Sequence, residues 1–105
     1  MNAIVHMDKI TKYLLNSAHK TGAPKAKFFI AKGFSPERPE ELAEALKRHP
    51  IEARLTGTEP DPEGRKLTYQ CDITIPDGTT TCVRSIWMEA EDGSYTRLIS
   101  AYPFH

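Results

Sequence analysis

The chain has 105 residues, about the size of one domain, with no room for a second hydrophobic core. Hydrophobic residues make up 39% and charged residues 27%, without repeats or low-complexity tracts, which is typical of a globular rather than a disordered chain, except at the ends. No apolar run approaches the roughly 20 residues of a membrane span. Asp8 and Lys9 stand where a signal peptide would be hydrophobic. We therefore expect a single domain over residues 1–105, in the cytoplasm and away from membranes.

The formal charge is zero in sum but not in distribution. Residues 1–50 hold nine Lys/Arg against five Asp/Glu, and residues 51–105 hold five against nine. The segment 9–34, KITKYLLNSAHKTGAPKAKFFIAKGF, contains six lysines, one histidine and no acidic residue. Charge asymmetry of this kind points to partners rather than to a fold. A polyanion such as RNA, or an acidic protein, is the expected partner of the first half.

Two short helices are predicted in the basic segment. The first covers about residues 8–16, with Asp8 as its cap and apolar residues at helical spacing. A loop over residues 17–24 follows. The second helix opens at Pro24 or Lys25 and stops at Gly33. Their apolar positions, which we assign to the core, include Tyr13, Leu14, Ala26 and Phe29.

A third helix is predicted from Ser35 or Pro36 to Pro50. Its apolar face has the spacing i, i+3, i+4, i+7, formed by Leu42, Ala45, Leu46 and His49. His49 lies in the last turn, where it either favours the helix dipole or packs against the core. A catalytic role is the minority interpretation.

From residue 51 the hydrophobic period changes to two, which is typical of strands. Four strands are predicted: Ile51–Glu59, Arg65–Ile75, Thr80–Glu89 and Tyr95–Tyr102. The connections between them are short enough for antiparallel neighbours. The expected fold class is therefore α+β, with a helical layer over residues 8–49 packed on a four-stranded antiparallel meander sheet over residues 51–103.

A two-residue turn at Asp77-Gly78 would pair residues whose numbers sum to 155, and this register separates two faces. The face expected to carry the helices holds Leu67, Tyr69, Cys71, Ile73, Ile75, Cys82, Ile86, Met88, Ile99 and Ala101. The other holds polar residues around Trp87. That tryptophan either contacts a partner, or lies under a loop or at a crystal or dimer contact, and a bulge would exchange the faces. Arg84 is expected on the face opposite Trp87.

Cys71 and Cys82 flank the same turn. In this register they sit diagonally at about 7–8 Å, which is too far for an unstrained disulfide. We expect two reduced thiols, in keeping with a reducing compartment. No paired ligand spacing predicts a zinc site, and no cofactor is implied.

His19 lies in a polar loop among lysines. A loop histidine titrates near neutral pH and lysines bind phosphate, which is the minimum equipment for metal-independent RNA cleavage. The neighbouring lysines are Lys12, Lys20, Lys25 and Lys27. A solvated, lysine-rich helix pair with an exposed histidine is the competing interpretation.

Three stretches carry a family resemblance: Lys9–Phe29, Val83–Trp87 and Arg97–Pro103. They resemble an uncharacterised bacterial domain family with the opening K-[LI]-x-x-Y-x-L-N-x-x-H-x-x-G-x-x-K-A-x-x-F and strands V-R-T-x-W and R-L-V-T-A-Y-P. The same opening occurs in toxin modules of contact-dependent and polymorphic bacterial toxins. Those modules resemble the barnase, EndoU, colicin and RelE ribonucleases, whose plan is N-terminal helices followed by a four-stranded antiparallel sheet. The chain departs mildly, with Ser85 and Ser100 where the family often has threonine.

The resemblance implies a metal-independent ribonuclease toxin of a toxin–antitoxin or polymorphic toxin system, with an acidic cognate antitoxin or immunity protein as partner. His19 would be the general acid or base, and Lys25 and Arg84 would neutralise the phosphate. The remaining roles would be orientation of the phosphate by Ser100 or Tyr102, base stacking by Trp87, and RNA binding by Lys12, Lys20 and Lys27.

Two other classes of protein remain open. The chain could be a non-catalytic binding module, either immunity- or antitoxin-like or a mobile-element accessory protein, that uses the Trp87 face or a free strand edge. It could also bind nucleic acid without catalysis. A nuclease should bring His19, Lys25 and either Ser100 or Tyr102 together in a cleft, whereas a binding module should scatter them.

Overall fold

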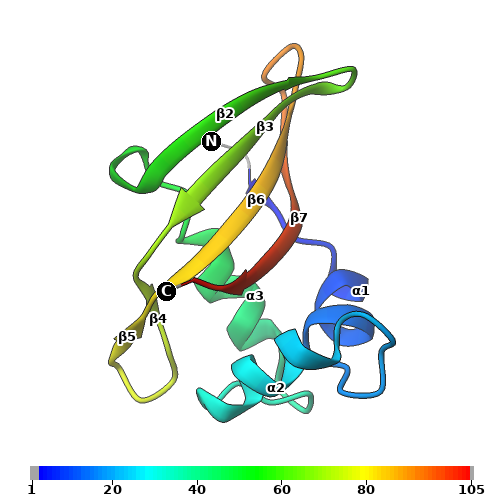
Figure 1. Cartoon of the computed structure of the whole chain (residues 1–105), viewed down its shortest axis with the longest axis vertical. Helices are drawn as coiled ribbons and strands as arrows, with labels where there is room; N and C mark the ends of the chain where they lie inside the picture. Colours follow the sequence, from blue (N-terminus) through cyan, green and yellow to red (C-terminus); the bar gives the residue numbers. More distant parts are fainter. Residues whose placement is uncertain (1–2, 105) are drawn as a thin grey trace.

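The computed structural model describes residues 3–104, in which a mixed five-stranded sheet is flanked by helices (Figure 1). The sheet has the order β1-β7-β6-β3-β2, and β4 and β5 form a separate two-stranded sheet. The strands are β1 Ala3–Ile4, β2 Leu55–Asp61, β3 Gly64–Gln70, β4 Ile73–Thr74, β5 Thr80–Thr81, β6 Val83–Ala90 and β7 Thr96–Pro103. The helices are α1 Met7–Lys9, the π-helical turn η1 Ile10–Leu14, α2 Ala23–Ala31, α3 Pro39–Lys47 and the short 3₁₀ turn η2 Glu52–Arg54.

The α+β class is confirmed, but the four-stranded antiparallel meander is wrong. β1 precedes the helices and pairs in parallel with β7, so the sheet is mixed and has five strands. A two-residue strand has no hydrophobic period, which is why the sequence pattern missed it. The boundaries also differ at the helices and at the first long strand. α3 begins at Pro39 rather than near Ser35, and residues 52–54 are helical where a strand was predicted. The N-cap position of α1 is His6 rather than Asp8, and its side chain makes no capping hydrogen bond.

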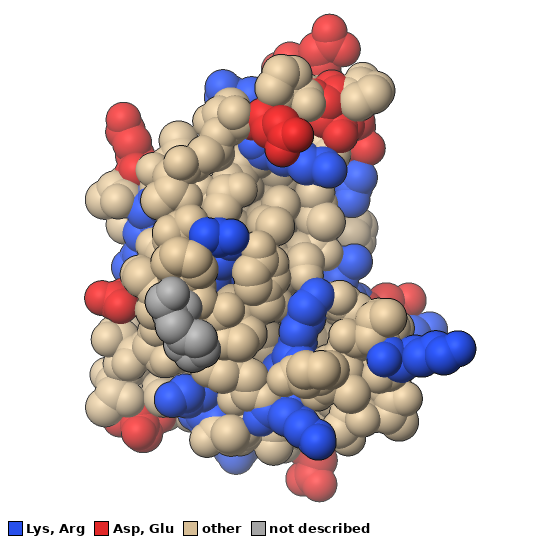
Figure 2. Space-filling view, in the orientation of Figure 1, with Lys and Arg blue, Asp and Glu red and all other residues tan. Residues whose placement is uncertain are grey.

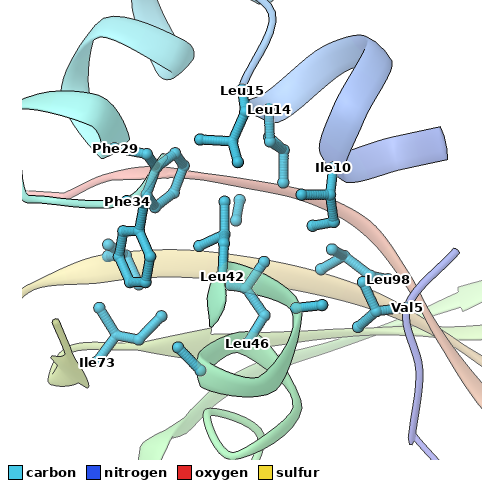
Figure 3. Close-up of a cluster of buried hydrophobic side chains, with 14 of the residues drawn as sticks. Val5, Ile10, Leu14, Leu15, Phe29, Phe34, Leu42, Leu46, Ile73 and Leu98 are labelled. Atoms are coloured by element: carbon cyan, nitrogen blue, oxygen red, sulfur yellow. The ribbon is translucent and has the colours of Figure 1, made fainter. Parts of the chain in front are cut away.

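The hydrophobic core lies between α3, the N-terminal helices and one face of the sheet (Figure 3). α3 contributes Leu42 and Leu46, both fully buried, from the face that its apolar spacing predicts. Burying one such leucine stabilises the fold by about 1.5–3 kcal/mol. Phe29 of α2 and Phe34 pack edge to face, with ring centroids 6.1 Å apart. These contacts fix the helices against the sheet. No helix in the described residues is long and apolar enough to cross a membrane.

The predicted strand register is wrong by one residue. The hairpin turn spans Pro76 to Gly78, with the amide N–H of Ile75 bonded to the carbonyl of Thr79, so paired residues sum to 154. A slip of one residue exchanges the faces of a whole strand. Trp87 is consequently paired with Leu67 and fully buried in the core rather than exposed. A bulge in β7 opposite Ile86 and Trp87 adds a second shift.

The cysteines form a disulfide, so the prediction of two reduced thiols is wrong. Cys71 follows the end of β3 and adopts a φ of 61°, a left-handed conformation that turns the chain out of the strand. That turn brings the Cα atoms of Cys71 and Cys82 to 3.9 Å and the two sulfurs into a bond. The regular hairpin assumed from the sequence would have kept them apart.

A buried polar chain joins α3 to the sheet through His49. Its Nε2 lies 2.7 Å from the carbonyl oxygen of Cys71, which can only accept, so Nε2 carries the ring proton. Nδ1 therefore accepts from the Ser85 hydroxyl at 2.6 Å, and Ser85 Oγ in turn accepts from Trp87 Nε1 at 2.8 Å. Burial lowers the pKa of His49, which is 1% exposed. His49 thus packs against the core, which confirms one of the two structural roles predicted for it.

Candidate functional site

Lys25 links the N-terminal helices to the last strand. Its Nζ donates hydrogen bonds to the hydroxyl of Tyr13 and, at 3.2 Å, to Oγ of Ser100. Lys25 lies in the first turn of α2, Tyr13 in η1 and Ser100 in β7. β1 pairs with β7 only as far as Arg97, and α2 packs against β7 while η1 packs against α2 (Figure 1). The ammonium therefore sits where three elements meet.

Arg84 and Tyr102 extend this cluster across the sheet. The two residues are paired between β6 and β7, and Arg84 Nη1 donates to the Tyr102 hydroxyl at 3.4 Å. Lys25 Nζ and Arg84 Cζ each lie 5.8 Å from the centroid of the Tyr102 ring. Both cations thus approach the same aromatic ring. We call the five residues Tyr13, Lys25, Arg84, Ser100 and Tyr102 the cationic rim.

Two further residues hold the Arg84 side chain. Its guanidinium stacks on Phe104, with Cζ 4.3 Å from the ring centroid. The Gln70 amide oxygen, assigned from the hydrogen-bond network, accepts from Arg84 Nη2 at 2.8 Å and from Nε at 3.1 Å. A planar guanidinium held by stacking and two hydrogen bonds is suited to binding a phosphate in a defined orientation.

The rim is positively charged. Within residues 3–104, none of the ion pairs includes Lys25 or Arg84. The hydrogen bond from Lys25 lowers the pKa of Tyr13 despite partial burial, and Ser100 and Lys9 act in the same direction. Figure 2 shows carboxylates gathered with Lys and Arg side chains at the tip of the long strands and others at the left and lower edges, whereas Lys and Arg side chains lie over the middle of that face. The rim therefore favours an anionic ligand.

His19 adjoins the rim through Tyr13. Their rings meet edge to face, with centroids 4.9 Å apart. His19 Nδ1 accepts the backbone N–H groups of Thr21 at 3.1 Å and Gly22 at 2.9 Å, which closes the turn before α2. Because Nδ1 accepts, the neutral ring carries its proton on Nε2. In that state His19 can donate a hydrogen bond through Nε2 but has no free nitrogen to accept a proton.

Gly22 allows this close packing. A Cβ atom there would lie 2.7 Å from the carbonyl oxygen of Tyr13, too close for any side chain. The loop consequently presses directly on η1 and orients the Tyr13 ring.

The structure thus brings together all five predicted catalytic positions, with Lys25, Arg84, Ser100 and Tyr102 in the rim and His19 beside it. The predicted RNA-binding residues are placed differently. Lys12 pairs with Asp8 at 3.5 Å on the exposed side of the first helix, and Lys20 and Lys27 are exposed and do not belong to the rim. Trp87 cannot stack on a base because it is fully buried, which corrects its assignment.

Sequence reasoning missed the role of Tyr13, which it placed in the core. The ring does pack against the core, but the side chain is only half-buried and its hydroxyl reaches Lys25. Gln70 and Phe104 were also missed. One feature of the sequence could have indicated the role of Tyr13. Tyr13, His19 and Lys25 lie close together in the sequence, on either side of and within the loop that connects η1 to α2.

We compared the rim with two other kinds of site in the described residues, a metal site and a cleft. No group of three or more His, Cys, Asp or Glu side chains within residues 3–104 could hold a metal ion. A cleft of about 300 Å³ lies between α3 and β4, and its lining includes Glu40, Glu44 and Pro76. It shares no residue with the rim, and its lining mixes the carboxylates with the guanidinium of Arg48. We place the candidate site at the rim because charge and hydrogen-bonding groups converge there.

The whole chain, residues 1–105, matches the family described as "Domain of unknown function (DUF6883)", and it belongs to that family. A comparison with curated proteins finds no match. Among solved structures, the chain is similar to one from a "Contact-dependent growth inhibition toxin - immunity protein complex from Klebsiella pneumoniae 342". The identity is 19%, the TM-score is 0.68, and the match covers 99% of this chain and 95% of the other. At this identity the likeness shows a shared fold.

Proposed function

We propose that this chain is a toxin-type ribonuclease module that cleaves RNA without a metal, with the cationic rim as its active site. The observation that carries the proposal is the hydrogen bond between Lys25 and Ser100, which joins residues 75 positions apart into one positively charged cluster. Rings and hydroxyl groups surround that charge, and RNA offers a phosphate, a base and a 2′-hydroxyl to match them. The fold shared with a chain of a toxin–immunity complex agrees with this role.

In the proposed reaction, Lys25 and Arg84, which both lie beside the Tyr102 ring, bind the scissile phosphate. Their charges stabilise the extra negative charge of the pentacoordinate phosphorus, which develops only in the transition state. Ser100 and Tyr102 orient the phosphate through their hydroxyl groups. His19, at the border of the rim, donates a hydrogen bond from Nε2 to the bound RNA.

The test is induced expression followed by examination of total RNA. Wild type is expected to arrest growth and fragment RNA, and Lys25→Met, which keeps the length of the side chain but removes its charge, is expected to do neither. Lys47→Met is the matched control, because Lys47 lies on α3 and pairs with Glu44 away from the rim. Intact RNA with the wild-type chain contradicts the proposal. Equal RNA cleavage by Lys25→Met contradicts the location of the site.

The proposed cognate partner is an acidic protein that covers the rim. Such a partner would neutralise Lys25 and Arg84 and exclude RNA at the same time. The similar solved structure is a complex of a toxin with an immunity protein, which agrees with a protein partner. Suppression of wild-type toxicity by a co-expressed acidic protein, and loss of its binding in Arg84→Met, would support this partner.

A second candidate function, a protein-binding module of the immunity or antitoxin type, is favoured by β2. This seven-residue strand lies at the sheet edge and, within the described residues, pairs only with β3, so its outer backbone groups can accept an added strand. Ile51 and Leu55, at the start of the edge, are 47% and 39% exposed. A chain that leaves RNA intact but protects cells from a co-expressed toxin would support this second function over the first.

A further inference from the structure

We propose that Tyr13, not His19, is the group that removes the 2′-hydroxyl proton, with Lys25 as the partner that holds its phenolic oxygen in place. This inference rests on the ribonuclease function proposed above and assigns the base within the same site. The geometry behind it is the direct contact of Lys25 Nζ with the Tyr13 hydroxyl, beside Ser100.

The contact fixes the direction of the hydrogen bond. A lysine ammonium only donates, so the phenolic oxygen of Tyr13 accepts. A phenol that accepts a hydrogen bond from a cation loses its own proton more readily, because the ammonium stabilises the negative phenolate more than it stabilises the neutral hydroxyl. The phenolate keeps a further lone pair that can accept a proton from the substrate.

The charges around Tyr13 act in one direction. Lys9 of α1 lies 5.4 Å from the centroid of its ring, and Lys25 of α2 lies 4.7 Å from it. The His19 ring faces it from the loop, and Ser100 faces it from β7. Two cations, an imidazole ring and a hydroxyl group thus surround the Tyr13 side chain. Its pKa is lowered, mainly by the hydrogen bond from Lys25.

The other tyrosines with perturbed ionisation behave in the opposite way. Burial raises the pKa of Tyr69, and a hydrogen bond to the Glu63 carboxylate raises the pKa of Tyr95. The contrast singles out the phenol at the rim. His19 is a poor base in this arrangement, because its Nδ1 is already used by the backbone N–H groups of Thr21 and Gly22.

The proposed step balances without any further reagent. The Tyr13 phenolate takes the proton of the 2′-hydroxyl, the 2′-oxygen forms a bond to phosphorus, and the bond from phosphorus to the 5′-oxygen breaks. The 5′-oxygen takes a proton from solvent water. The products are a 2′,3′-cyclic phosphate and a free 5′-hydroxyl, and the neutral Tyr13 hydroxyl returns its proton to water before the next cycle.

The first test does not depend on RNA cleavage. The folded protein is titrated with base while the ultraviolet absorbance of tyrosinate is recorded. One tyrosine is expected to ionise ahead of Tyr69 and Tyr95, and that first step should be absent in Tyr13→Phe and moved to higher pH in Lys25→Met. Tyr95→Phe, which removes the same atom at the acidic tip, should keep it. Persistence of the first step in Tyr13→Phe overturns the inference.

The second test measures kcat and KM on a short RNA. Tyr13→Phe keeps the ring that packs against His19 and Gly22, so the fold should survive, as thermal unfolding can verify. Loss of a general base should lower kcat by about 10²-fold or more with KM little changed. The falling limb of kcat at low pH should also disappear.

The outcomes separate the two proposals. If wild type cleaves RNA and Tyr13→Phe cleaves it equally fast, the assignment of the base is wrong and the ribonuclease function stands. If wild type does not cleave RNA, both fail, even where the tyrosinate titration behaves as expected. A Tyr13→Phe protein that binds RNA with unchanged affinity but no longer cleaves it supports both.

Discussion

Arg84 and Tyr102 lie directly opposite one another on β6 and β7, and the guanidinium donates to the phenolic hydroxyl at 3.4 Å. The pairing follows from a register in which Trp87 points into the core and Arg84 points out. A residue of each strand thus reaches the same surface as Lys25, which arrives from α2. The pairing makes the sheet one side of the cationic rim.

We expect Arg84→Met to weaken RNA binding, because it removes a phosphate-binding cation but keeps much of the side-chain length. Removal of one such cation should reduce the slope of log affinity against log salt by about 0.7 for single-stranded RNA. Fluorescence anisotropy at several salt concentrations measures this slope. Arg65→Met is the control, since Arg65 pairs with Glu89 elsewhere on the sheet. An unchanged slope in Arg84→Met would remove Arg84 from the site.

We expect Trp87→Phe to destabilise the fold without affecting RNA chemistry directly. The change leaves a cavity in the core and deprives Ser85 Oγ of its indole donor. The expected loss in the free energy of unfolding is about 1–3 kcal/mol. Urea denaturation measures the loss. A loss of RNA binding in the folded variant, with stability unchanged, would restore the stacking role that burial of Trp87 excludes.

Gly22→Ala should destabilise the turn between η1 and α2. Its Cβ would lie 2.7 Å from the Tyr13 carbonyl oxygen, so the loop or the ring must move, at a cost of about 1–3 kcal/mol. Gly57→Ala is the matched comparison, because the nearest atom to its Cβ is Thr68 Cβ at 3.7 Å, an ordinary contact. Equal thermal midpoints for the two variants would show that the close approach at Gly22 has no energetic consequence.

Stability should fall as the solution becomes more acidic than the ordinary pKa of histidine, because of His49. Burial lowers its pKa in the folded state, so the unfolded chain binds more protons in this range and the free energy of unfolding rises with pH. The contribution is fully present above the unfolded pKa of about 6.5 and is lost as the pH falls through the lower folded value.

Urea midpoints for wild type, His49→Gln and His6→Gln at about pH 7.5 and pH 5.5 test this linkage. His49→Gln should be less stable than wild type at the higher pH and less sensitive to acid. His6→Gln should retain the pH dependence of wild type. A wild-type midpoint that does not change between the two conditions contradicts the account.

Removal of the Cys71–Cys82 disulfide should lower stability. The bond closes a loop with a sequence separation of 11, for which an entropic contribution of about 2–4 kcal/mol is typical. A double Cys→Ser variant should lose this amount and should no longer respond to reductant, whereas wild type should lose it on reduction. Equal midpoints for wild type with and without reductant would indicate that the bond contributes nothing.

The sequence predicted α3 well because a helix with one buried stripe repeats its apolar residues at a fixed spacing, here ending at Leu46 and His49. The strand register predicted from the sequence was wrong because the turn after Ile75 has three residues instead of two. The alternation of apolar and polar residues does not reveal the length of a turn. The left-handed φ of Cys71 was equally invisible, since it belongs to a non-glycine residue. Both depend on tertiary packing rather than on local preference.

The candidate site was predictable in part. Lys25, Arg84, Ser100 and Tyr102 stood out by their residue types and by family resemblance, and the structure gathers them. Tyr13 did not, because an aromatic residue at helical spacing is ordinarily a core residue. Only the fold shows that its ring packs on the core while its hydroxyl accepts a hydrogen bond from Lys25.

The rim unites the early and late parts of the chain, and this has a consequence during synthesis. Translation proceeds from the amino terminus, so Lys25 is made 75 residues before Ser100. A nascent chain that has folded its helices still lacks Ser100 and Tyr102 while β7 remains inside the ribosome. The charged cluster therefore cannot form until β7 has left the ribosome, so its assembly is a late event in the folding of this domain.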